Sequence, residues 1–280
     1  MSCVILPATC PLCGTPQPRF SSVTICDACW MEIRSGGDAV CVRCGDGLAA
    51  PDVDDLCRAC RMTPPPFERA VAYGPYDGRM RDAIHALKYD RLHPAAQVLG
   101  KVLAAAVAQL AGQAPAEMLV TPVPLHRRKL NERGFNQARL LAAEALRELG
   151  RTHPAWKLTL ADSLVLRTRP TASQAGLTPR QRRLNVRTAF KVRDAAAVAG
   201  RDILIVDDIL TTGATARAAS KVLLDAGTKS VWVATLARAR RPFFAPQGGI
   251  AEQSEIQGNG DYAAPLYAEG MHTAANQPSL

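Results

Sequence analysis

The sequence predicts an α/β protein with a largely parallel sheet and helices on both faces, preceded by a small cysteine-rich domain. From residue 69 to about residue 240, segments typical of buried strands alternate with segments of helical periodicity, as in parallel sheets. All nine cysteines, in contrast, lie within the first 60 residues, and eight of them form pairs. We expect domains at 1–62 and 69–240, a Pro-rich linker at 63–68, and a disordered tail at 241–280, which has no apolar period.

The cysteines form four Cys-x-x-Cys pairs, separated by gaps of twelve, eleven and twelve residues: Cys10/Cys13, Cys26/Cys29, Cys41/Cys44 and Cys57/Cys60. Two thiolates at this spacing can wrap a tetrahedral Zn²⁺, and two such pairs complete a four-cysteine site. A glycine follows the first and third pairs, and its positive φ would turn backbone N–H groups toward the sulfur atoms. We therefore expect two structural Zn²⁺ ions in a double zinc ribbon.

The favoured pairing is sequential, with the first two pairs on one ion and the last two on the other. A crossed, RING-like pairing is an alternative. A disulfide framework and redox dithiols are further alternatives, but four regular pairs in a chain without a secretion signal fit both poorly. Eight thiolates (−8) and two Zn²⁺ (+4) contribute −4, so the formal net charge of +9 falls to about +5.

Further elements follow in chain order. Three consecutive prolines mark the linker. Strands are expected over 118–123, 163–167, 202–208 and 230–237. Helices are expected over 78–89, over 95–112, along the stripe of Ala138, Leu141, Ala142, Ala145 and Leu149, and after residue 210 up to Gly227. No stretch approaches the roughly 18 apolar residues of a membrane span, and no signal peptide is evident, so we expect a cytoplasmic protein.

Positive charge is concentrated in two runs. The stretch 124–139 carries five Lys or Arg residues and one glutamate, and the stretch 167–193 carries eight basic residues and no acid. Such runs are often solvated faces. A run without acids, in a chain with 25 acidic residues, nevertheless favours an anionic partner.

The stretch ILIVDDILTTGAT, residues 203–215, places two carboxylates at the end of a buried strand and hydroxyls before a helix. In open α/β sheets, ligands bind beyond the carboxyl ends of the strands. A glycine, threonine hydroxyls and the N–H groups of a helix N-terminus suit a phosphate monoester. Carboxylates would repel that phosphate but accept hydrogen bonds from vicinal hydroxyls. Together these groups suit ribose 5-phosphate.

This stretch resembles the signature with which type I phosphoribosyltransferases bind phosphoribosyl pyrophosphate (PRPP), and all thirteen positions fit. The resemblance implies that Asp207 and Asp208 hold the ribose 2′ and 3′ hydroxyls and act in catalysis. It also implies that the following loop holds the 5′-phosphate, through Thr211, Thr212, Gly213, Ala214 and Thr215.

From Cys10 to about Arg238, the order of motifs is similar to that of the competence protein F (ComF) family. The shared motifs are the four cysteine pairs, YDGRMRDAIHALKY, TPVPLHRRKLNERGFNQARLLA, QAGLTPRQRRLNVRTAF and the PRPP signature. The resemblance implies a double zinc ribbon followed by a type I phosphoribosyltransferase-like sheet. It further implies that residues 122–129 form a pyrophosphate loop, in which Arg127 and Arg128 contact the pyrophosphate, and that Lys88 reaches into the site. Mg²⁺ would bind together with PRPP. The acid-free run, 167–193, would be a flap that closes over the site.

Two function classes follow. One is an enzyme that transfers ribose 5-phosphate from PRPP to a nitrogen nucleophile or back. The alternative is a non-catalytic factor that handles single-stranded DNA together with other competence proteins. The acid pair favours PRPP, because carboxylates repel phosphodiesters. Aromatic stacking platforms for single strands are also scarce in the basic runs, where only Phe135 and Phe190 lie in or beside them.

Overall fold

The fold is built around β6 (Asp202–Leu210), which carries four consecutive branched apolar residues. Such a run is typical of a strand that is buried on both faces of a parallel sheet. β6 pairs in parallel with β7 (Ser230–Arg238) on one side and with β2 (Glu117–Pro122) on the other. β1 (Ala70–Pro75) and β3 (Lys157–Leu160) complete the sheet, whose strand order is β1-β7-β6-β2-β3.

The computed structural model describes residues 9–16, 25–33, 39–48, 54–89, 93–169 and 188–239. All of these residues belong to one compact unit. The tail predicted to be disordered, 241–280, and residues 170–187 of the acid-free run lie outside the described residues.

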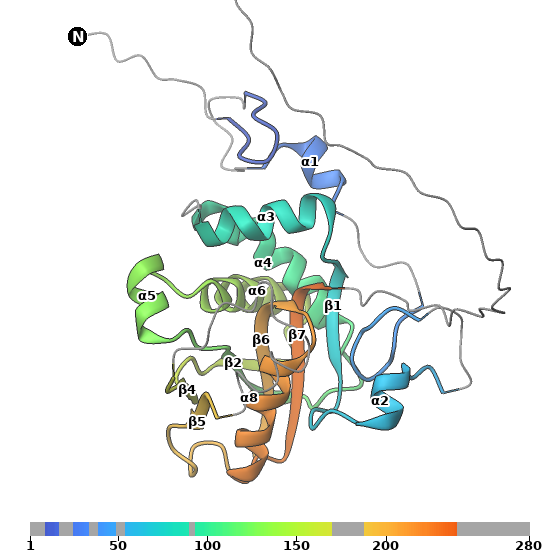
Figure 1. Cartoon of the computed structure of the whole chain (residues 1–280), viewed down its shortest axis with the longest axis vertical. Helices are drawn as coiled ribbons and strands as arrows, with labels where there is room; N and C mark the ends of the chain where they lie inside the picture. Colours follow the sequence, from blue (N-terminus) through green and yellow to red (C-terminus); the bar gives the residue numbers. More distant parts are fainter. Residues whose placement is uncertain are drawn as a thin grey trace, which may run out of the picture. The chain divides into compact units, whose positions relative to one another are not determined.

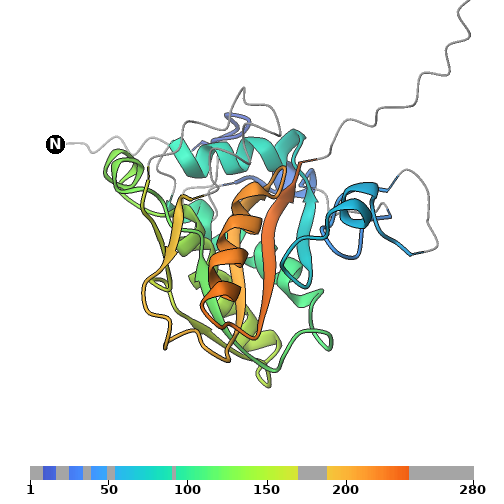
Figure 2. The same cartoon turned by 60° about the horizontal axis from the view of Figure 1, so that its bottom comes forward.

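Side chains of β6 alternate between two hydrophobic cores on opposite faces of the sheet. Leu204 and Val206 pack with α4 (His93–Ala108) and α6 (Gln137–Thr152). Ile203 and Ile205 pack in the core that contains α8 (Ala214–Asp225). Figure 2 shows α8, in orange, in front of β6 and β7, with α6 behind the sheet. The predicted α/β fold with helices on both faces is confirmed.

The helix α6 confirms its predicted apolar stripe completely. All five stripe residues, from Ala138 to Leu149, are buried. The helix begins after Asn136, whose side chain accepts a hydrogen bond from the Ala138 N–H group and so satisfies one of the unpaired N–H groups of the first turn. The same Asn136 donates to the Val123 carbonyl at 3.0 Å, which fixes the helix to the end of β2.

The helix predicted over 95–112 is α4, which ends four residues earlier than expected. It ends at Ala108, and the next residues form bonds to carbonyls three positions back, from Gln109 N–H to Ala106 and from Leu110 N–H to Val107. Such bonds tighten a last turn. Gly112, at φ +78°, then takes the chain out of the helical region.

Sequence patterns missed three strands. β1 and β3 lie outermost in the sheet, where one side of the backbone and much of the side-chain surface need no apolar partner. The third is β5 (Phe190–Val192), which pairs antiparallel with β4 (Val165–Arg167) in a separate two-stranded sheet. The strand predicted over 163–167 therefore exists in part, but outside the parallel sheet.

The cysteine-rich region includes two five-residue helices, α1 (Asp27–Met31) and α2 (Arg58–Met62), each starting after a cysteine. The region also contacts the strands, since the Ala70 N–H group of β1 donates to the Arg43 carbonyl at 2.9 Å. The Pro-rich linker is packed as well: Phe67 is buried, and Arg217 of α8 donates to the carbonyls of Thr63 and Pro64.

Among the described residues, no helix combines the length and the apolar character that a membrane span requires.

Candidate functional site

Asp207 and Asp208 lie on β6 just past the point where β2 leaves the sheet. The β2 pairing ends at Pro122 opposite Val206, whereas the pairing with β7 continues to Leu210. Proline supplies no N–H group for a ladder, which explains why β2 ends here. β6 thus extends two residues beyond the predicted end, and the acid pair lies where the sheet opens, the usual place of ligand sites in such sheets.

A positive group meets the acid pair from α3 (Gly78–Tyr89), which lies beyond the carboxyl ends of the strands (Figure 1). The Nζ atom of Lys88, near the end of this helix, forms an ion pair with Oδ2 of Asp208. The Lys88 side chain is 19% exposed and the Asp208 side chain 7%. Lys88 thus lies beside the acid pair, and its contact with PRPP stays a prediction.

The protonation equilibria show how charge is distributed in this site. Burial raises the pKa of Asp207 well above its usual range, and the negative charge of Asp208 adds to this shift. Burial by itself lowers the pKa of Lys88, but the charges of Asp208 and Asp207 outweigh burial and raise that pKa. Without a ligand, the charged form of Asp207 is therefore disfavoured unless a cation or hydrogen-bond donors compensate its charge.

The loop from Thr211 to Thr215 connects β6 with α8. Gly213, at φ +74°, is the residue before the helix, and the Thr212 hydroxyl accepts a hydrogen bond from the Ala214 N–H group at 3.4 Å. The first turn of α8 contains no acidic residue. Its N–H groups and the positive end of the helix dipole thus face the loop without a competing carboxylate, an arrangement that suits a phosphate. We call residues 211–215 the phosphate loop.

Four basic residues from three elements interact electrostatically, and two of them, Lys88 and Arg167, also interact with Asp207. Burial, followed by the positive charges of Arg167, Arg133 and Lys88, lowers the pKa of Lys129. Burial also lowers the pKa of Arg167, while the Asp207 charge opposes this effect. We call Lys88, Lys129, Arg133 and Arg167 the basic group. Its members come from α3, from β4 and from the short helix α5 (Arg127–Arg133).

Arg127 and Arg128 occupy a different position. They begin α5, in the stretch expected to be a pyrophosphate loop, and both are exposed. The Nε atom of Arg128 lies 2.8 Å from Oε1 of Glu132, and the Arg128 side chain is 79% exposed. Lys129 is exposed as well, whereas Arg133 is half-buried. The assignment of Arg127 and Arg128 as pyrophosphate contacts stays a prediction. Lys129 and Arg133, which were not selected from the sequence, share one helix face at their i, i+4 spacing.

Both ends of the acid-free run are held together. Arg167 of β4 lies opposite Phe190 of β5, with the guanidinium carbon 5.5 Å from the ring centroid. The Thr168 N–H group donates to the Ala189 carbonyl at 2.9 Å. Residues 169 and 188 are therefore near neighbours, and the antiparallel ladder fixes the backbone of Arg167 opposite Phe190. The predicted flap, 170–187, lies outside the described residues.

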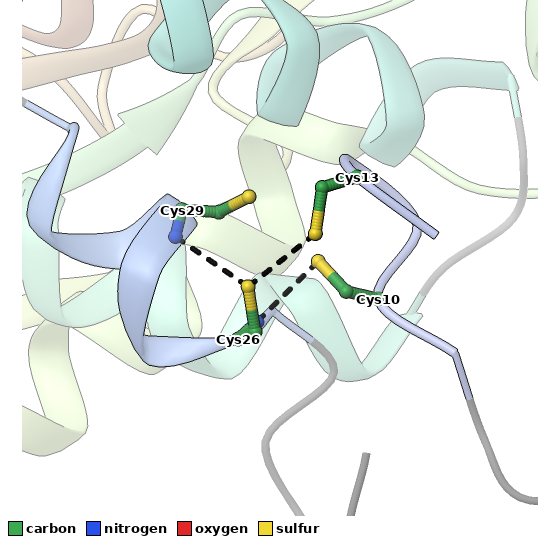
Figure 3. A group of neighbouring side chains, drawn as sticks. All are labelled: Cys10, Cys13, Cys26 and Cys29. Atoms are coloured by element: carbon green, nitrogen blue, oxygen red, sulfur yellow. Dashed lines mark hydrogen bonds between the residues drawn. The ribbon is translucent and has the colours of Figure 1, made fainter. Parts of the chain in front are cut away.

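The cysteines form two groups in the sequential arrangement. Within each group the sulfur atoms all lie within 4.8 Å of one another; the first zinc group is Cys10, Cys13, Cys26 and Cys29, and the second zinc group is Cys41, Cys44, Cys57 and Cys60. Figure 3 shows the sulfur atoms of the first group converging from both sides, with the Cys26 N–H group donating to Cys10 Sγ. The Cys13–Cys26 and Cys44–Cys57 sulfur distances are 3.5 and 3.6 Å.

These distances fit tetrahedral zinc, in which Zn–S bonds of about 2.3 Å place sulfur atoms roughly 3.8 Å apart. The glycines after the first and third pairs have the expected positive φ, +74° at Gly14 and +65° at Gly45. Hydrogen bonds from Thr15, through its hydroxyl and then its N–H group, lower the pKa of Cys13 to about 6, which favours the thiolate that binds metal. The two Cys₄ groups support structural zinc.

Two family models match the chain. A double zinc ribbon domain matches residues 1–63, and a phosphoribosyl transferase domain matches residues 136–261. The second match includes the acid pair, the phosphate loop and Arg167, and it begins after α5 and Lys88.

Relatives of similar length are found in several bacteria. The chain is 33% identical to DNA utilization protein YhgH of Escherichia coli strain K12 over 235 residues, which cover 83% of this chain and 98% of that protein. It is 32% identical to the protein of the same name from Salmonella typhi, with the same coverage. It is 29% identical to Competence protein F of Haemophilus influenzae over 218 residues, which cover 77% of this chain and 90% of that protein.

Proposed function

Because this chain belongs to the family of double zinc ribbon and phosphoribosyl transferase domain proteins that includes YhgH and Competence protein F, we propose that it binds PRPP at the acid pair and the phosphate loop. The observation that carries the proposal is the position of Asp207 and Asp208. They lie beyond the end of the β2 pairing, a few residues before the N-terminus of α8. One end of the site accepts hydroxyls and the other binds phosphate.

Each part of PRPP has a matching group. The ribose 2′ and 3′ hydroxyls donate to Asp207 and Asp208, and these bonds offset the burial and, after it, the Asp208 charge that raise the pKa of Asp207. The phosphate loop, residues 211–215, binds the 5′-phosphate. The basic group faces the pyrophosphate, where its positive charges stabilise negative charge developing on the leaving group. Adjacent carboxylates with unfavourable mutual charge also fit Mg²⁺, which would bind with PRPP and neutralise pyrophosphate charge.

The proposed reaction is transfer of ribose 5-phosphate to or from a nitrogen nucleophile. Asp207 and Asp208 hold the sugar while the bond between C1′ and the pyrophosphate oxygen breaks. Positive charge develops at C1′, and the electron pair of the broken bond leaves with pyrophosphate. Lys88 holds the Asp208 side chain in place for this task through their ion pair.

The first test uses the double substitution Asp207→Asn and Asp208→Asn. It keeps the shape of the acid pair but removes two anionic acceptors, and bonds to charged groups contribute about 1.5–3 kcal/mol each. The affinity for PRPP with Mg²⁺, measured by calorimetry, should fall at least roughly tenfold. Ribose 5-phosphate, which has the same hydroxyls, should lose affinity as well. Unchanged affinity for both ligands would contradict the assignment of the acid pair.

A second test separates the basic group from its neighbours on α5. Lys129→Ala with Arg133→Ala should weaken PRPP binding more than ribose 5-phosphate binding, because only PRPP carries pyrophosphate. Arg127→Ala with Arg128→Ala is the matched control, since it removes the same charge from the same helix. If the control weakens PRPP binding more, the pyrophosphate contacts are Arg127 and Arg128, as the family resemblance implies.

A role in competence, through handling of single-stranded DNA, is the second candidate. It is supported by the names of the relatives and by the positive charge of the chain. Removing two carboxylates should strengthen attraction to DNA phosphates, so the Asn pair should affect DNA and PRPP binding in opposite directions. In a plot of the logarithm of the DNA affinity against the logarithm of the salt concentration, the slope should be less steep for the Lys129 and Arg133 variant than for the parent. The slope should change by about 0.7 for each DNA phosphate that these two side chains neutralise in the parent. Filter binding over a salt series measures both effects.

A further inference from the structure

Arg238, the last residue of β7, is a buried guanidinium between the second zinc group and the phosphate loop. Its side chain is 5% exposed, and it lies opposite Leu210 in the pairing of β6 and β7. A buried guanidinium needs hydrogen-bond partners for its N–H groups and a negative charge nearby. Arg238 finds them on two separate parts of the chain.

On one side, Arg238 contacts the turn that carries the third cysteine pair. Its Nε atom donates to the Cys44 carbonyl at 3.2 Å, and its Nη2 atom lies 3.2 Å from Oδ2 of Asp46. Asp46 is equally buried, at 7% side-chain exposure, and its carbonyl accepts a hydrogen bond from the Cys41 N–H group at 2.7 Å. The contacts of Arg238 therefore depend on the shape of the turn that a zinc ion would fix.

On the other side, Arg238 holds the start of the phosphate loop. Its Nη1 atom donates to the Leu210 carbonyl at 2.8 Å and to the Thr211 carbonyl. These carbonyls precede Gly213, whose positive φ directs the chain into α8. A shift of the guanidinium would move both carbonyls and, with them, the N–H groups that face a phosphate.

We propose that Arg238 is a positioning residue that couples the second zinc group to the phosphate loop. The proposal rests on the proposed function of that loop. A guanidinium is a rigid planar fork, so a change in the Cys41–Asp46 turn is transmitted to the loop carbonyls. Coupling of this kind is reciprocal: zinc in the second group raises the affinity of the loop for a sugar 5′-phosphate, and that ligand raises the affinity of the same group for zinc.

The first zinc group provides the internal comparison. Its polar contact with the α/β part runs through Arg79 of α3, whose Nε atom lies 2.9 Å from Oε2 of Glu32 and whose Nη1 atom donates to the Leu12 carbonyl. Its buried residues also pack in the hydrophobic core that contains α3 and α4: Cys10, Ile25, Cys29 and Ile33. This group thus contacts the helices through apolar packing and a partly exposed ion pair, and Arg238 has no part in that contact.

The test uses Asp46→Asn, which keeps the size of the side chain but removes the charge that faces Arg238. The affinity for ribose 5-phosphate should fall roughly fivefold or more, at a temperature where circular dichroism shows the variant fully folded. Glu68→Gln is the matched control, since Glu68 pairs with Arg43 of the same cysteine-rich region at 3.3 Å, and its affinity should stay within about twofold of the parent. Equal losses in both variants would overturn the coupling.

Zinc release gives a readout that a purely structural role would not move. With a chromophoric chelator, saturating ribose 5-phosphate should slow the release of one of two zinc ions from the parent. Ribose 5-phosphate should not slow the release of either zinc ion from the Asp46→Asn variant or from the Arg238→Lys variant. Lysine keeps the positive charge of Arg238 but lacks the planar guanidinium. Slowing of both ions, or of neither, in the parent would contradict the proposal.

A ligand-free measurement separates this proposal from the proposed function. If the parent does not bind ribose 5-phosphate, the proposed function is contradicted. Hydrogen exchange of the ligand-free protein then tests by itself whether the second zinc group is coupled to the phosphate loop. Asp46→Asn should then raise amide exchange in residues 210–215, whereas Glu32→Gln, in the first zinc region, should leave it unchanged. If Asp46→Asn does not fold, Arg238→Lys replaces it. Unchanged exchange in the folded variant would overturn the coupling.

Discussion

The protonation state of Asp207 that favours folding differs from the one that the proposed ligand binding needs. Its raised pKa means that folding disfavours its charged form, while the proposed hydroxyl contacts need a carboxylate. Below the unfolded pKa of about 3.9, the side chain is protonated in both states and no penalty arises. As the pH rises through that value toward the folded pKa, the unfolded state releases its proton first, and the free energy of unfolding of the ligand-free protein falls.

Asp207→Asn should remove this pH-dependent penalty. The difference in free energy of unfolding between the variant and the parent should shift in favour of the variant as the pH rises from about 4. Urea denaturation of the ligand-free proteins across this range measures the shift. Asp225→Asn, at the exposed ion pair with Lys221, serves as a surface control. A difference that does not change with pH would show that Asp207 is readily ionised in the free protein.

At the residue scale, short spacings along the chain were sufficient to predict the position of the acid pair at a strand end and the grouping of the cysteines. They were insufficient for Lys129, Arg133 and Arg167. Each of these is one basic residue among several in its run, and only the fold decides which basic side chains interact with one another. Arg238 was missed for the same reason, since its partners lie 28 and 194 positions away in the sequence.

At the scale of elements, α4 and α6 approach each other closely at Gly100. A Cβ atom at this position would overlap the Glu144 Cβ and lie 3.2 Å from the Glu144 Cα. Neither atom can move without shifting the α6 backbone. Gly150, also in a helix, has no atom within 4 Å of such a Cβ. The two glycines therefore differ in packing alone.

Gly100→Ala should lower the free energy of unfolding by about 1–3 kcal/mol, since overpacking forces the two helices apart. Gly150→Ala should raise it by about 0.5–1 kcal/mol, because alanine restricts the unfolded chain and favours a helix. Chemical denaturation of both variants measures the two values. A Gly100→Ala variant as stable as the parent would show that α4 and α6 do not approach so closely.

Element prediction succeeded where one physical period dominated. The stripe of α6 repeats over four turns and is buried along its whole length, so it could be predicted directly. The buried side of α8 is harder to predict: Ala214, Ala216, Ala219 and Leu223 are buried, whereas Ala218, Val222 and Ala226 are partly exposed. The turn at Gly213 sets the rotation of this helix, and spacing alone does not reveal it.

At the scale of the whole molecule, metal content is the decisive quantity. Elemental analysis of the purified protein should find two zinc ions per chain. Zinc-dependent folding of small cysteine domains contributes roughly 10–16 kcal/mol per ion, more than a short segment with few large apolar residues gains from packing. Chelation should therefore unfold the cysteine-rich region, which limited proteolysis would detect. One zinc or none, with all eight cysteines reduced, would contradict the double zinc ribbon.

The contact between Arg43 and β1 has a consequence for self-association. β1 and β3 end the sheet, and the outward backbone groups of an end strand can pair with a strand of another molecule. β3 limits this by being only four residues long and carrying Lys157. β1 is shielded by other groups: the Arg43 carbonyl occupies its Ala70 N–H group, and the Gln109 side chain donates to its Ala72 carbonyl. Loss of the second zinc ion would thus uncover a template for strand addition, so metal-depleted protein should aggregate through the very edge that the ribbon covers.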